Sequence, residues 1–255
     1  MILKGKKILI TRPEPFASEL AKQLLSFEAQ AILFPLVEIE SGKDTDKLPA
    51  YLSALSDYHW AIFNSPTAVL EVVKKLNVAW PSGLSVAAIG EGTASRLRNA
   101  GISLAAVPKQ FNSEALLALP HFQKIVGKKI LLFRGEGGRA LLAPALQARG
   151  AQVTDLQVYR RAAPCDKNSA SKVHEWQQIG IDAIVVSSQE ILNNLIKLVG
   201  HLADNWLKKQ TLLVTSLPIY QAAISAGFQR VWLAKNASHE AIVETLKEEL
   251  WKQIK

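Results

Sequence analysis

Short apolar runs alternate with stretches of helical periodicity along the whole chain. After the first run, for example, Leu20, Leu24 and Leu25 recur at the spacing of one helix face. Strands that are apolar throughout are typical of parallel sheets covered by helices on both faces. We therefore predict an α/β protein with ten strands, at Ile8–Thr11, Ala31–Ile39, Trp60–Asn64, Ser85–Ile89, Leu104–Val107, Ile130–Phe133, Val153–Tyr159, Ala183–Val186, Thr211–Val214 and Val231–Leu233.

The segment Lys128–Arg161 shows the pattern most clearly, as a strand, a glycine turn, a helix ending at Gly150 and a second strand. The same βαβ pattern begins at Lys6, and further landmarks recur at a constant separation. These pairs are Arg12 and Arg134, Ile62 and Ile184, and Ser65 and Ser187, with Ser113 and Ser238 close to the same offset. Such a repeat indicates an internal duplication, and hence two five-stranded doubly wound domains.

The second strand of each copy is unusually long, and a strand that outruns its neighbours can bridge to another domain. If both bridge, the middle of the chain is an insertion. One domain is then residues 1–36 plus 162–255, and the other is residues 37–161. The alternative is two sequential domains divided near residue 125, and the strand pattern alone leaves both open.

Small, hydroxylic and basic residues follow many of the predicted strands. In open parallel sheets, ligands bind outside the carboxyl ends of the strands, where free N–H groups of helix N-termini favour anions. Tyr159 ends a bridging strand, and its phenol either faces a cleft or packs on the strand. The other candidates at strand ends are Thr11, Arg12, Asn64, Ser65, Gly90, Gly92, Thr93, Arg134, Gly135, Ser187, Ser188, Thr215 and Ser216.

Composition narrows the ligand class. The chain of 255 residues has a formal net charge of +8, which suits a polyanionic partner. Its basic residues are spread out, which favours a small anion over nucleic acid. The five His residues have no metal-ligand spacing. No apolar run approaches the roughly 20 residues of a membrane helix, and the lone Cys165 fits a reducing cytosol.

Several motifs occur together in one order through most of the chain. They resemble the uroporphyrinogen-III synthase family, which implies two doubly wound, flavodoxin-like α/β domains joined by a two-stranded ladder, the second inserted in the first. The insertion is therefore the arrangement we expect. The motifs are Ile8-Leu9-Ile10-Thr11-Arg12-Pro13, Phe63-Asn64-Ser65-Pro66-Thr67-Ala68-Val69, Ala88-Ile89-Gly90-Glu91-Gly92-Thr93-Ala94, Phe133-Arg134-Gly135-Glu136-Gly137-Gly138-Arg139, Val158-Tyr159-Arg160-Arg161 and Ser187-Ser188.

The resemblance implies a cytoplasmic, cofactor-free and metal-free reaction. The linear tetrapyrrole hydroxymethylbilane loses its terminal hydroxyl to give an azafulvene, and closes through a spiro intermediate to uroporphyrinogen III with ring D inverted. Tyr159 is the expected catalytic residue, assisting loss of the hydroxyl. The expected substrate-binding residues are Arg12, Ser65, Thr67, Gly90, Thr93, Arg134, Gly135, Arg139, Ser187 and Ser188.

The expected partner is this small molecule, bound by a monomer without nucleic acid or membrane. One departure is that Leu217-Pro218-Ile219 follows Thr215-Ser216, where the family often has hydroxyl residues. The alternative function is a non-enzymatic two-domain clamp for a small polyanion, which would bind hydroxymethylbilane without turning it over. A nucleic-acid binder, the third possibility, would show strongly salt-dependent affinity for DNA or RNA.

Overall fold

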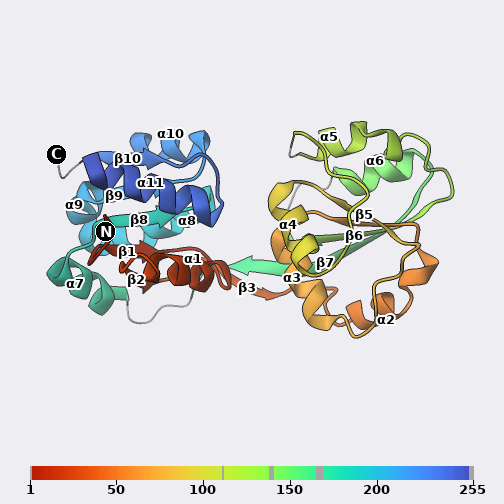
Figure 1. The fold of residues 1–255 in the computed structure, drawn as a ribbon, viewed down its shortest axis with the longest axis horizontal. Helices are drawn as coiled ribbons and strands as arrows, with labels where there is room; N and C mark the ends of the chain where they lie inside the picture. The colour runs from red at the N-terminus through yellow and green to blue at the C-terminus, as the bar shows by residue number, and fades with distance from the viewer. Residues whose placement is uncertain (1, 111, 138–140, 165–168, 253–255) are drawn as a thin grey trace. The chain divides into compact units, whose positions relative to one another are not determined.

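The structure is a computed structural model that describes residues 2–110, 112–137, 141–164 and 169–252. The chain divides into two compact units (Figure 1). Unit 1 comprises Met1–Ile39 and Ala162–Lys255, and unit 2 comprises Glu40–Arg161. The chain thus leaves unit 1 once and returns once. That residues 1–36 plus 162–255 and residues 37–161 are separate folding domains stays a prediction.

Unit 1 is built on a parallel sheet of five strands among the described residues, in the order β10-β9-β8-β1-β2. Numbered along the chain within the unit, this order is 2-1-3-4-5 read from β2, which is the flavodoxin-like arrangement. Its elements are β1 (Lys7–Ile10), α1 (Phe16–Leu25), β2 (Gln30–Leu33), α7 (Ser169–Ile179), β8 (Ala183–Val186), α8 (Gln189–Leu195), a π-helical turn (Ile196–Gly200), α9 (His201–Lys209), β9 (Thr211–Val214), α10 (Leu217–Ser225), β10 (Arg230–Leu233) and α11 (His239–Lys252).

Both faces of this sheet are covered, which explains why its central strands are apolar throughout. On one face, helices α7, α8, α9 and α10 pack over Leu9 and Ile184. Trp176 is fully buried there, and its ring meets the edge of Phe34 with centroids 4.7 Å apart. On the other face, α1 and α11 pack over Ile8 and the neighbouring strand. Burying apolar side chains on both faces supplies the main stabilisation of such a layer.

Unit 2 carries the second sheet, in the order β3-β7-β6-β4-β5. Phe63 and Phe133 stack side by side on its central strands, 4.8 Å between centroids. Its elements are β3 (Glu38–Ser41), α2 (Leu48–Ser53), a 3-10 turn (Leu55–Asp57), β4 (Trp60–Phe63), α3 (Pro66–Lys75), β5 (Ser85–Ala88), α4 (Glu91–Asn99), α5 (Ser113–Ala118), a 3-10 turn (Pro120–Phe122), β6 (Lys129–Gly135), α6 (Leu142–Ala148) and β7 (Gln152–Ala162).

The two sheets repeat one strand arrangement. The row β7-β6-β4-β5 in unit 2 matches the row β2-β1-β8-β9 in unit 1. Each unit therefore combines the βαβ segment of one sequence repeat with the later strands of the other. The strands that carry the chain between units, β3 and β7, are hydrogen-bonded neighbours. The predicted fold class, two doubly wound α/β layers joined by a two-stranded ladder, is confirmed.

Two of the predicted strands differ in the structure. The run predicted as one strand, Ala31–Ile39, is divided, because Pro35 has no N–H for a sheet ladder: β2 ends at Leu33, and β3 begins at Glu38 in the other sheet. The predicted strand Leu104–Val107, which Pro108 follows, makes a single bridge, between Ala87 and Ala106.

Candidate active site

The topological switch point of unit 2 lies between β6 and β4. From β6 the chain continues through α6 to β7 on one side, whereas from β4 it continues through α3 to β5 on the other. Ligands of doubly wound sheets bind in the crevice at this point, outside the carboxyl ends of the strands. Gly135 ends β6 and Ser65 follows β4, so two of the predicted site residues flank the switch point.

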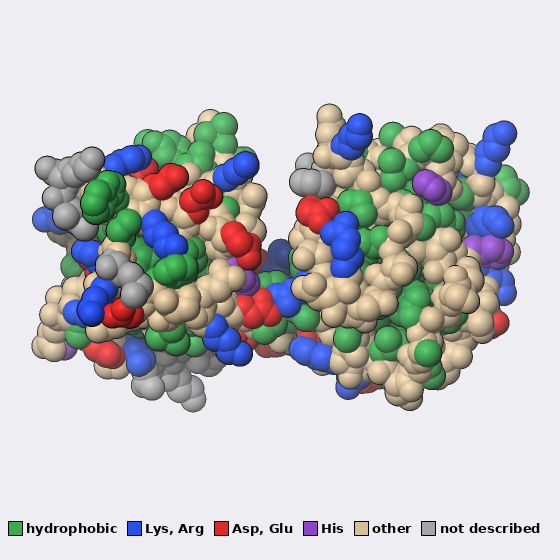
Figure 2. Space-filling view, in the orientation of Figure 1, with side chains coloured by type: hydrophobic (Ala, Val, Ile, Leu, Met, Phe, Trp, Pro, Cys, Tyr) green, Lys and Arg blue, Asp and Glu red, His purple; other side chains and the backbone are tan. Residues whose placement is uncertain are grey.

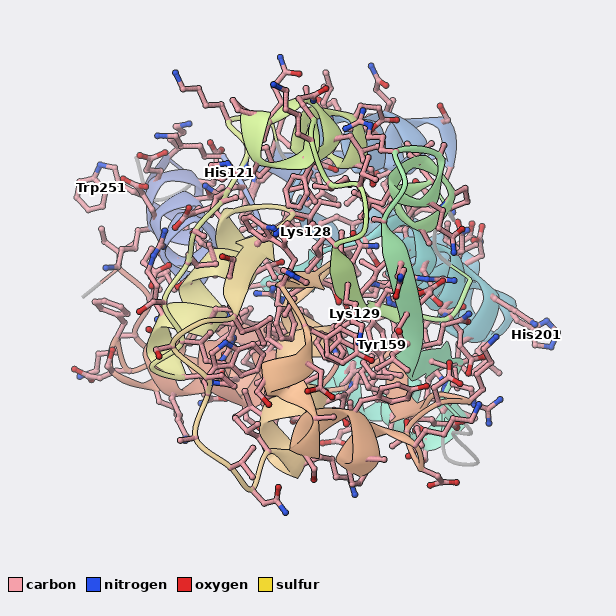
Figure 3. All side chains as sticks on the ribbon, turned by 90° about the vertical axis from the view of Figure 1, so that its right-hand side faces the viewer. His121, Lys128, Lys129, Tyr159, His201 and Trp251 are labelled. Atoms are coloured by element: carbon pink, nitrogen blue, oxygen red, sulfur yellow. The ribbon has the colours of Figure 1, made fainter. Side chains whose placement is uncertain are left out.

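Tyr159 reaches this point from the neighbouring strand β7. The residue, labelled in Figure 3, is 4% exposed. The Tyr159 hydroxyl lies 3.1 Å from Ser65 Oγ, and either group can donate the hydrogen bond. The same Ser65 Oγ accepts the Ala68 N–H at 3.1 Å, so it also caps α3. The structure thus shows a packed ring whose hydroxyl is bonded to Ser65 at the sheet edge, and the catalytic role of Tyr159 stays a prediction.

The ring can take this path because β6 has no side chain at Gly135. A Cβ added there would lie 2.5 Å from Tyr159 Cζ and 2.8 Å from its hydroxyl oxygen. The pairing of β6 with β7 also shifts at this place: Arg134 pairs with Gln157, but Gly135 pairs with Tyr159. Val158 is therefore an extra residue, a β-bulge of the kind that re-aims side chains beside active sites.

The side of β7 away from β6 is contacted closely by the first segment of unit 2. A Cβ on Gly42 would collide with the Gln157 carbonyl oxygen and would lie 2.5 Å from the Tyr159 nitrogen. The segment after it bonds to the bulge: Asp44 N–H donates to Gln157 O at 3.2 Å, and Thr45 Oγ1 donates to Val158 O at 3.0 Å. The backbone of Tyr159 is thus fixed from both sides.

Asp44 closes this arrangement with its carboxylate, which accepts the Gln157 N–H at 3.1 Å and Lys47 Nζ at 3.0 Å. Burial alone would raise the pKa of Asp44. The hydrogen bonds from Gln157 and Lys47, with the positive charges of Lys47 and Lys43, outweigh that effect and hold the pKa below its ordinary value. Asp44 is therefore a charged structural group at neutral pH rather than a proton donor.

Arg134 is buried and is engaged by Asp155 in a two-pronged ion pair. Its Nε donates to Oδ1 at 2.7 Å and its Nη2 to Oδ2 at 2.8 Å. Gln157, with its amide oxygen turned toward them, accepts from Arg134 Nη2 and Lys43 Nζ at 3.0 Å each. The Asp155 hydrogen bonds, opposed by burial and aided by the charges of Asp155 and Asp44, raise the pKa of Arg134. Its charge is thus balanced within unit 2.

Thr67, Gly90 and Thr93 lie on the two helices that start beside Ser65. Thr67 and Thr93 are buried in the first turns of α3 and α4, and Gly90 is the N-cap of α4. The two first turns are adjacent, since Pro66 Cγ is 3.6 Å from the place of a Cβ on Gly92. No side chain caps the N-terminus of α4. Its amides are thus suited to an anionic group of a ligand.

The remaining predicted residues belong to unit 1, apart from Arg139, which lies outside the described residues. Arg12 follows β1, with its guanidinium carbon 5.5 Å from the centroid of the Phe16 ring. Ser188 caps α8 by accepting the Ile191 N–H at 3.2 Å, and Ser187 O accepts a bond from Thr215 Oγ1 at 3.3 Å. Because β1 and β8 flank the switch point of unit 1, these residues occupy the equivalent position there. The counterpart of Ser65 as a cap is Ser188 rather than Ser187.

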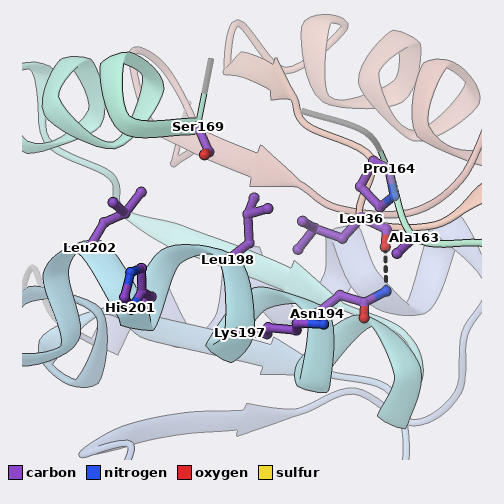
Figure 4. A pocket seen from close by; sticks show the side chains of 9 residues that line it. All are labelled: Leu36, Ala163, Pro164, Ser169, Asn194, Lys197, Leu198, His201 and Leu202. Atoms are coloured by element: carbon purple, nitrogen blue, oxygen red, sulfur yellow. Dashed lines mark hydrogen bonds between the residues drawn. The ribbon is translucent and has the colours of Figure 1, made fainter. Parts of the chain in front are cut away.

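Unit 1 also has a cavity of about 300 Å³ beside the π-helical turn (Figure 4). Asn194 Nδ2 donates to Leu36 O at 2.7 Å at its edge, and Lys197 and His201 lie in its wall. Pro164 and Ser169, also in its wall, border residues outside the described ranges, so we assign it no ligand. In the described ranges, His, Cys, Asp and Glu form no cluster suited to a metal ion. No helix there has the length and apolarity needed to span a membrane.

Sequence reasoning missed Asp155, Asp44, Gln157 and Gly42, the residues that support the site rather than form it. Asp155 had a signal, because a charged residue inside a predicted sheet strand needs a partner. Gly42 and Gln157 had none, because their roles depend on how closely β7 and the segment after β3 approach.

Two flavodoxin-like layers with hydroxyl groups and helix N-termini at their switch points define a doubly wound α/β protein with a candidate ligand site at the strand ends. The sequence model of the family described as uroporphyrinogen-III synthase HemD matches residues 18–244. The uroporphyrinogen-III synthase of Escherichia coli is 34% identical over 245 residues, covering 94% of this chain and 99% of that protein. That of Synechococcus elongatus is 32% identical over 197 residues, covering 75% and 69%.

Solved structures agree in fold. A mutant uroporphyrinogen III synthase from Thermus thermophilus matches with a TM-score of 0.61 and 17% identity, covering 97% of this chain and 100% of that one. The synthetase from Helicobacter pylori gives a TM-score of 0.57 at 15% identity, covering 98% and 100%. The chain belongs to the uroporphyrinogen-III synthase family, and it is an enzyme of that type.

Proposed function

We propose that the protein converts hydroxymethylbilane to uroporphyrinogen III and water, with inversion of ring D, and that Tyr159 assists the first step. The observation that carries the catalytic assignment is the Tyr159 hydroxyl held 3.1 Å from Ser65 Oγ at the switch point. A substrate approaches this hydroxyl from the side of Ser65, which is half-buried. The position fits the rule that ligands of doubly wound sheets bind at this edge.

Tyr159 donates its proton to the terminal hydroxyl, which departs as water, and the N–H of the same pyrrole ring returns a proton to the phenolate, so that the neutral azafulvene remains. If Ser65 donates to the Tyr159 oxygen, the phenol proton remains available for the substrate. Ser65 Oγ already accepts the Ala68 N–H, so its own proton can turn toward Tyr159. The rest of the catalysis is positioning, because a flexible chain must be held with its two end rings together.

The substrate carboxylates are bound by neutral donors and by cations away from Arg134. The N-terminal amides of α4, beginning at Gly90, and the hydroxyls of Thr67 and Thr93 are the donors that we propose in unit 2. Since Asp155 balances the charge of Arg134, we expect the Arg134 side chain to contribute little to binding of the substrate carboxylates. Arg12, Arg139, Ser187 and Ser188 remain candidates for the other contacts.

The reaction itself is tested by incubating the purified protein with hydroxymethylbilane, without added metal or cofactor, and separating the uroporphyrin isomers after oxidation. The expected product is mainly isomer III. Formation of isomer I alone, at the rate of the uncatalysed control, would contradict the proposal. It would instead support a clamp that binds the polyanion without turnover.

The role of Tyr159 is tested by Tyr159→Phe, which removes the hydroxyl and keeps the ring over Gly135. A positioned proton donor typically contributes on the order of 100- to 10,000-fold, so kcat should fall by roughly this factor while KM changes little. A thermal melt serves as the control for folding. A variant that melts normally and turns over at the wild-type rate would show that Tyr159 is only packing.

We also propose that the enzyme acts as a cytoplasmic monomer without nucleic acid, and that its two predicted domains fold separately. On the face shown in Figure 2, Lys and Arg side chains are scattered rather than gathered in one patch. Cell fractionation tests the location, light scattering tests the monomeric state, and a DNA mobility shift tests for nucleic-acid binding. Expression of residues 37–161 alone, followed by a thermal melt, tests the last.

A further inference from the structure

The path of the Tyr159 side chain depends on two unusual features of β6 and β7. Strand β6 lies between β7, which carries Tyr159, and β4, which leads to Ser65. Neighbouring strands are about 4.8 Å apart, so a side chain from β7 must pass over β6 to reach the far side. It does so at Gly135, where a Cβ would be 2.5 Å from the ring.

The bulge brings Tyr159 to that gap, and the ion pair fixes the bulge. Without this register shift, Gly135 would pair with Val158, and Tyr159 would lie one position further along. A one-residue change of register moves side chains to the opposite face of a strand. Arg134, the last residue before the shift, binds Asp155 on β7 and also donates through Nη1 to Gly135 O at 3.2 Å.

We propose that Gly135 is a positioning residue for Tyr159 rather than a substrate-binding residue, and that the Arg134–Asp155 ion pair supports it by fixing the register. This inference rests on the proposed catalytic role of Tyr159. The gap at Gly135 places the phenol against Ser65, and any larger residue displaces the hydroxyl from the position in which it meets the substrate. A displacement of about 1 Å in an active site can reduce turnover by roughly 100-fold.

The test is Gly135→Ala, with Gly83→Ala as the matched control. A Cβ on Gly83 meets nothing within 4 Å, so this control makes the same substitution in unit 2 without a collision. Gly135→Ala should lower kcat by roughly 100-fold with KM nearly unchanged, since the reactive hydroxyl moves and the carboxylate contacts remain. Loss of a substrate contact at Gly135 would instead raise KM. Gly83→Ala should match the wild type in both.

A second measurement is independent of turnover. In the wild-type background, Gly135→Ala should lower Tm by roughly 2–12 °C, as overpacking does in a protein of this size. In a Tyr159→Leu background the aromatic ring is gone, so the same substitution should cost little. If Gly135→Ala does not fold alone, recovery of a cooperative melt in the double variant gives the same result.

The outcomes separate this inference from the proposed function. An equal Tm decrease in both backgrounds would overturn the inference, because Gly135 would then act through something other than the ring. Wild-type kcat in Gly135→Ala, beside an impaired Tyr159→Phe, would also overturn it and leave the catalytic role of Tyr159 intact. Wild-type kcat in Tyr159→Phe would overturn the catalytic role first, and the positioning role with it.

Discussion

Gly42→Ala should weaken unit 2 at the place where its first segment meets β7. The added methyl group would collide with Gln157 O, and it would lie 2.5 Å from Tyr159 N and 2.8 Å from Gln157 C. All three are backbone atoms of one strand, so no side-chain rotation can relieve the contact. The segment from Gly42 to Thr45 must move away from β7, or β7 must move away from β6.

The size of the effect follows from what such a movement breaks. Overpacking typically costs 1–3 kcal/mol, and a rigid backbone neighbour favours the upper end, about 3 kcal/mol. Three hydrogen bonds cross the same contact: Asp44 N–H to Gln157 O at 3.2 Å, Gln157 N–H to Asp44 Oδ2 at 3.1 Å, and Thr45 Oγ1 to Val158 O at 3.0 Å. Losing one of them adds about 1 kcal/mol, which gives a total of about 4 kcal/mol.

The assay is a thermal melt beside hydrogen exchange of the β7 amides. For a chain of this length 1 kcal/mol corresponds to about 2–4 °C, so Tm should fall by roughly 8–16 °C. Protection of the Gln157 amide should fall more than that of β1 in unit 1, because the damage is local. Gly83→Ala is again the control. A Gly42→Ala variant within about 1 °C of the wild type would refute the close approach of the two segments.

Three further outcomes follow from the charged groups. Because the pKa of Asp44 is lowered in the folded state, its contribution is present above its ordinary value of 3.8 and is lost as pH falls through the folded pKa. Asp44→Asn should therefore lower the urea midpoint at pH 7 more than at pH 3, and parallel curves would contradict this. Asp155→Asn leaves the buried Arg134 without its counter-charge, and because Asp155 itself is partly exposed the free energy of unfolding should fall by only about 2 kcal/mol. Raising salt should increase KM for hydroxymethylbilane through screening, and an unchanged KM would count against attraction of the substrate by the positive charge of the protein.

Most of the layer structure could be predicted because apolar strands and helical spacing report burial directly. Trp60–Phe63 and Ala183–Val186 are buried at every position, as the sequence indicated. The break at Pro35 was harder, because a strand that changes sheets and a single long strand have the same local pattern. The run Leu104–Val107 was predicted as a strand but makes a single bridge, at Ala106. A short apolar run does not show how many hydrogen bonds it makes with a neighbouring strand.

The candidate site was predictable in its hydroxyl groups and not in its supports. Tyr159 and Ser65 could be singled out because they end or follow strands, and strand ends meet at one edge of a parallel sheet. That Gly135 leaves room for the ring depends on the extra residue Val158, and a bulge in a parallel pair has no sequence pattern of its own. That Arg134 forms an ion pair with Asp155 could not be predicted, because the sequence does not give the register that brings the two side chains together.

The pairing of Arg134 with Asp155 changes how a protein of charge +8 can bind a polyanion. Because Arg134 is already held by a carboxylate, we expect the substrate carboxylates in unit 2 to be oriented by hydroxyls and helix amides. Those donors work at hydrogen-bond distance and are little affected by salt, whereas the summed positive charge acts over a Debye length, about 10 Å at 0.1 M salt. We therefore expect attraction of the substrate and its alignment in unit 2 to depend on different groups. Salt should therefore change KM and leave kcat nearly constant, and a kcat that fell in parallel with affinity would mean that a free cation helps to align the reacting rings.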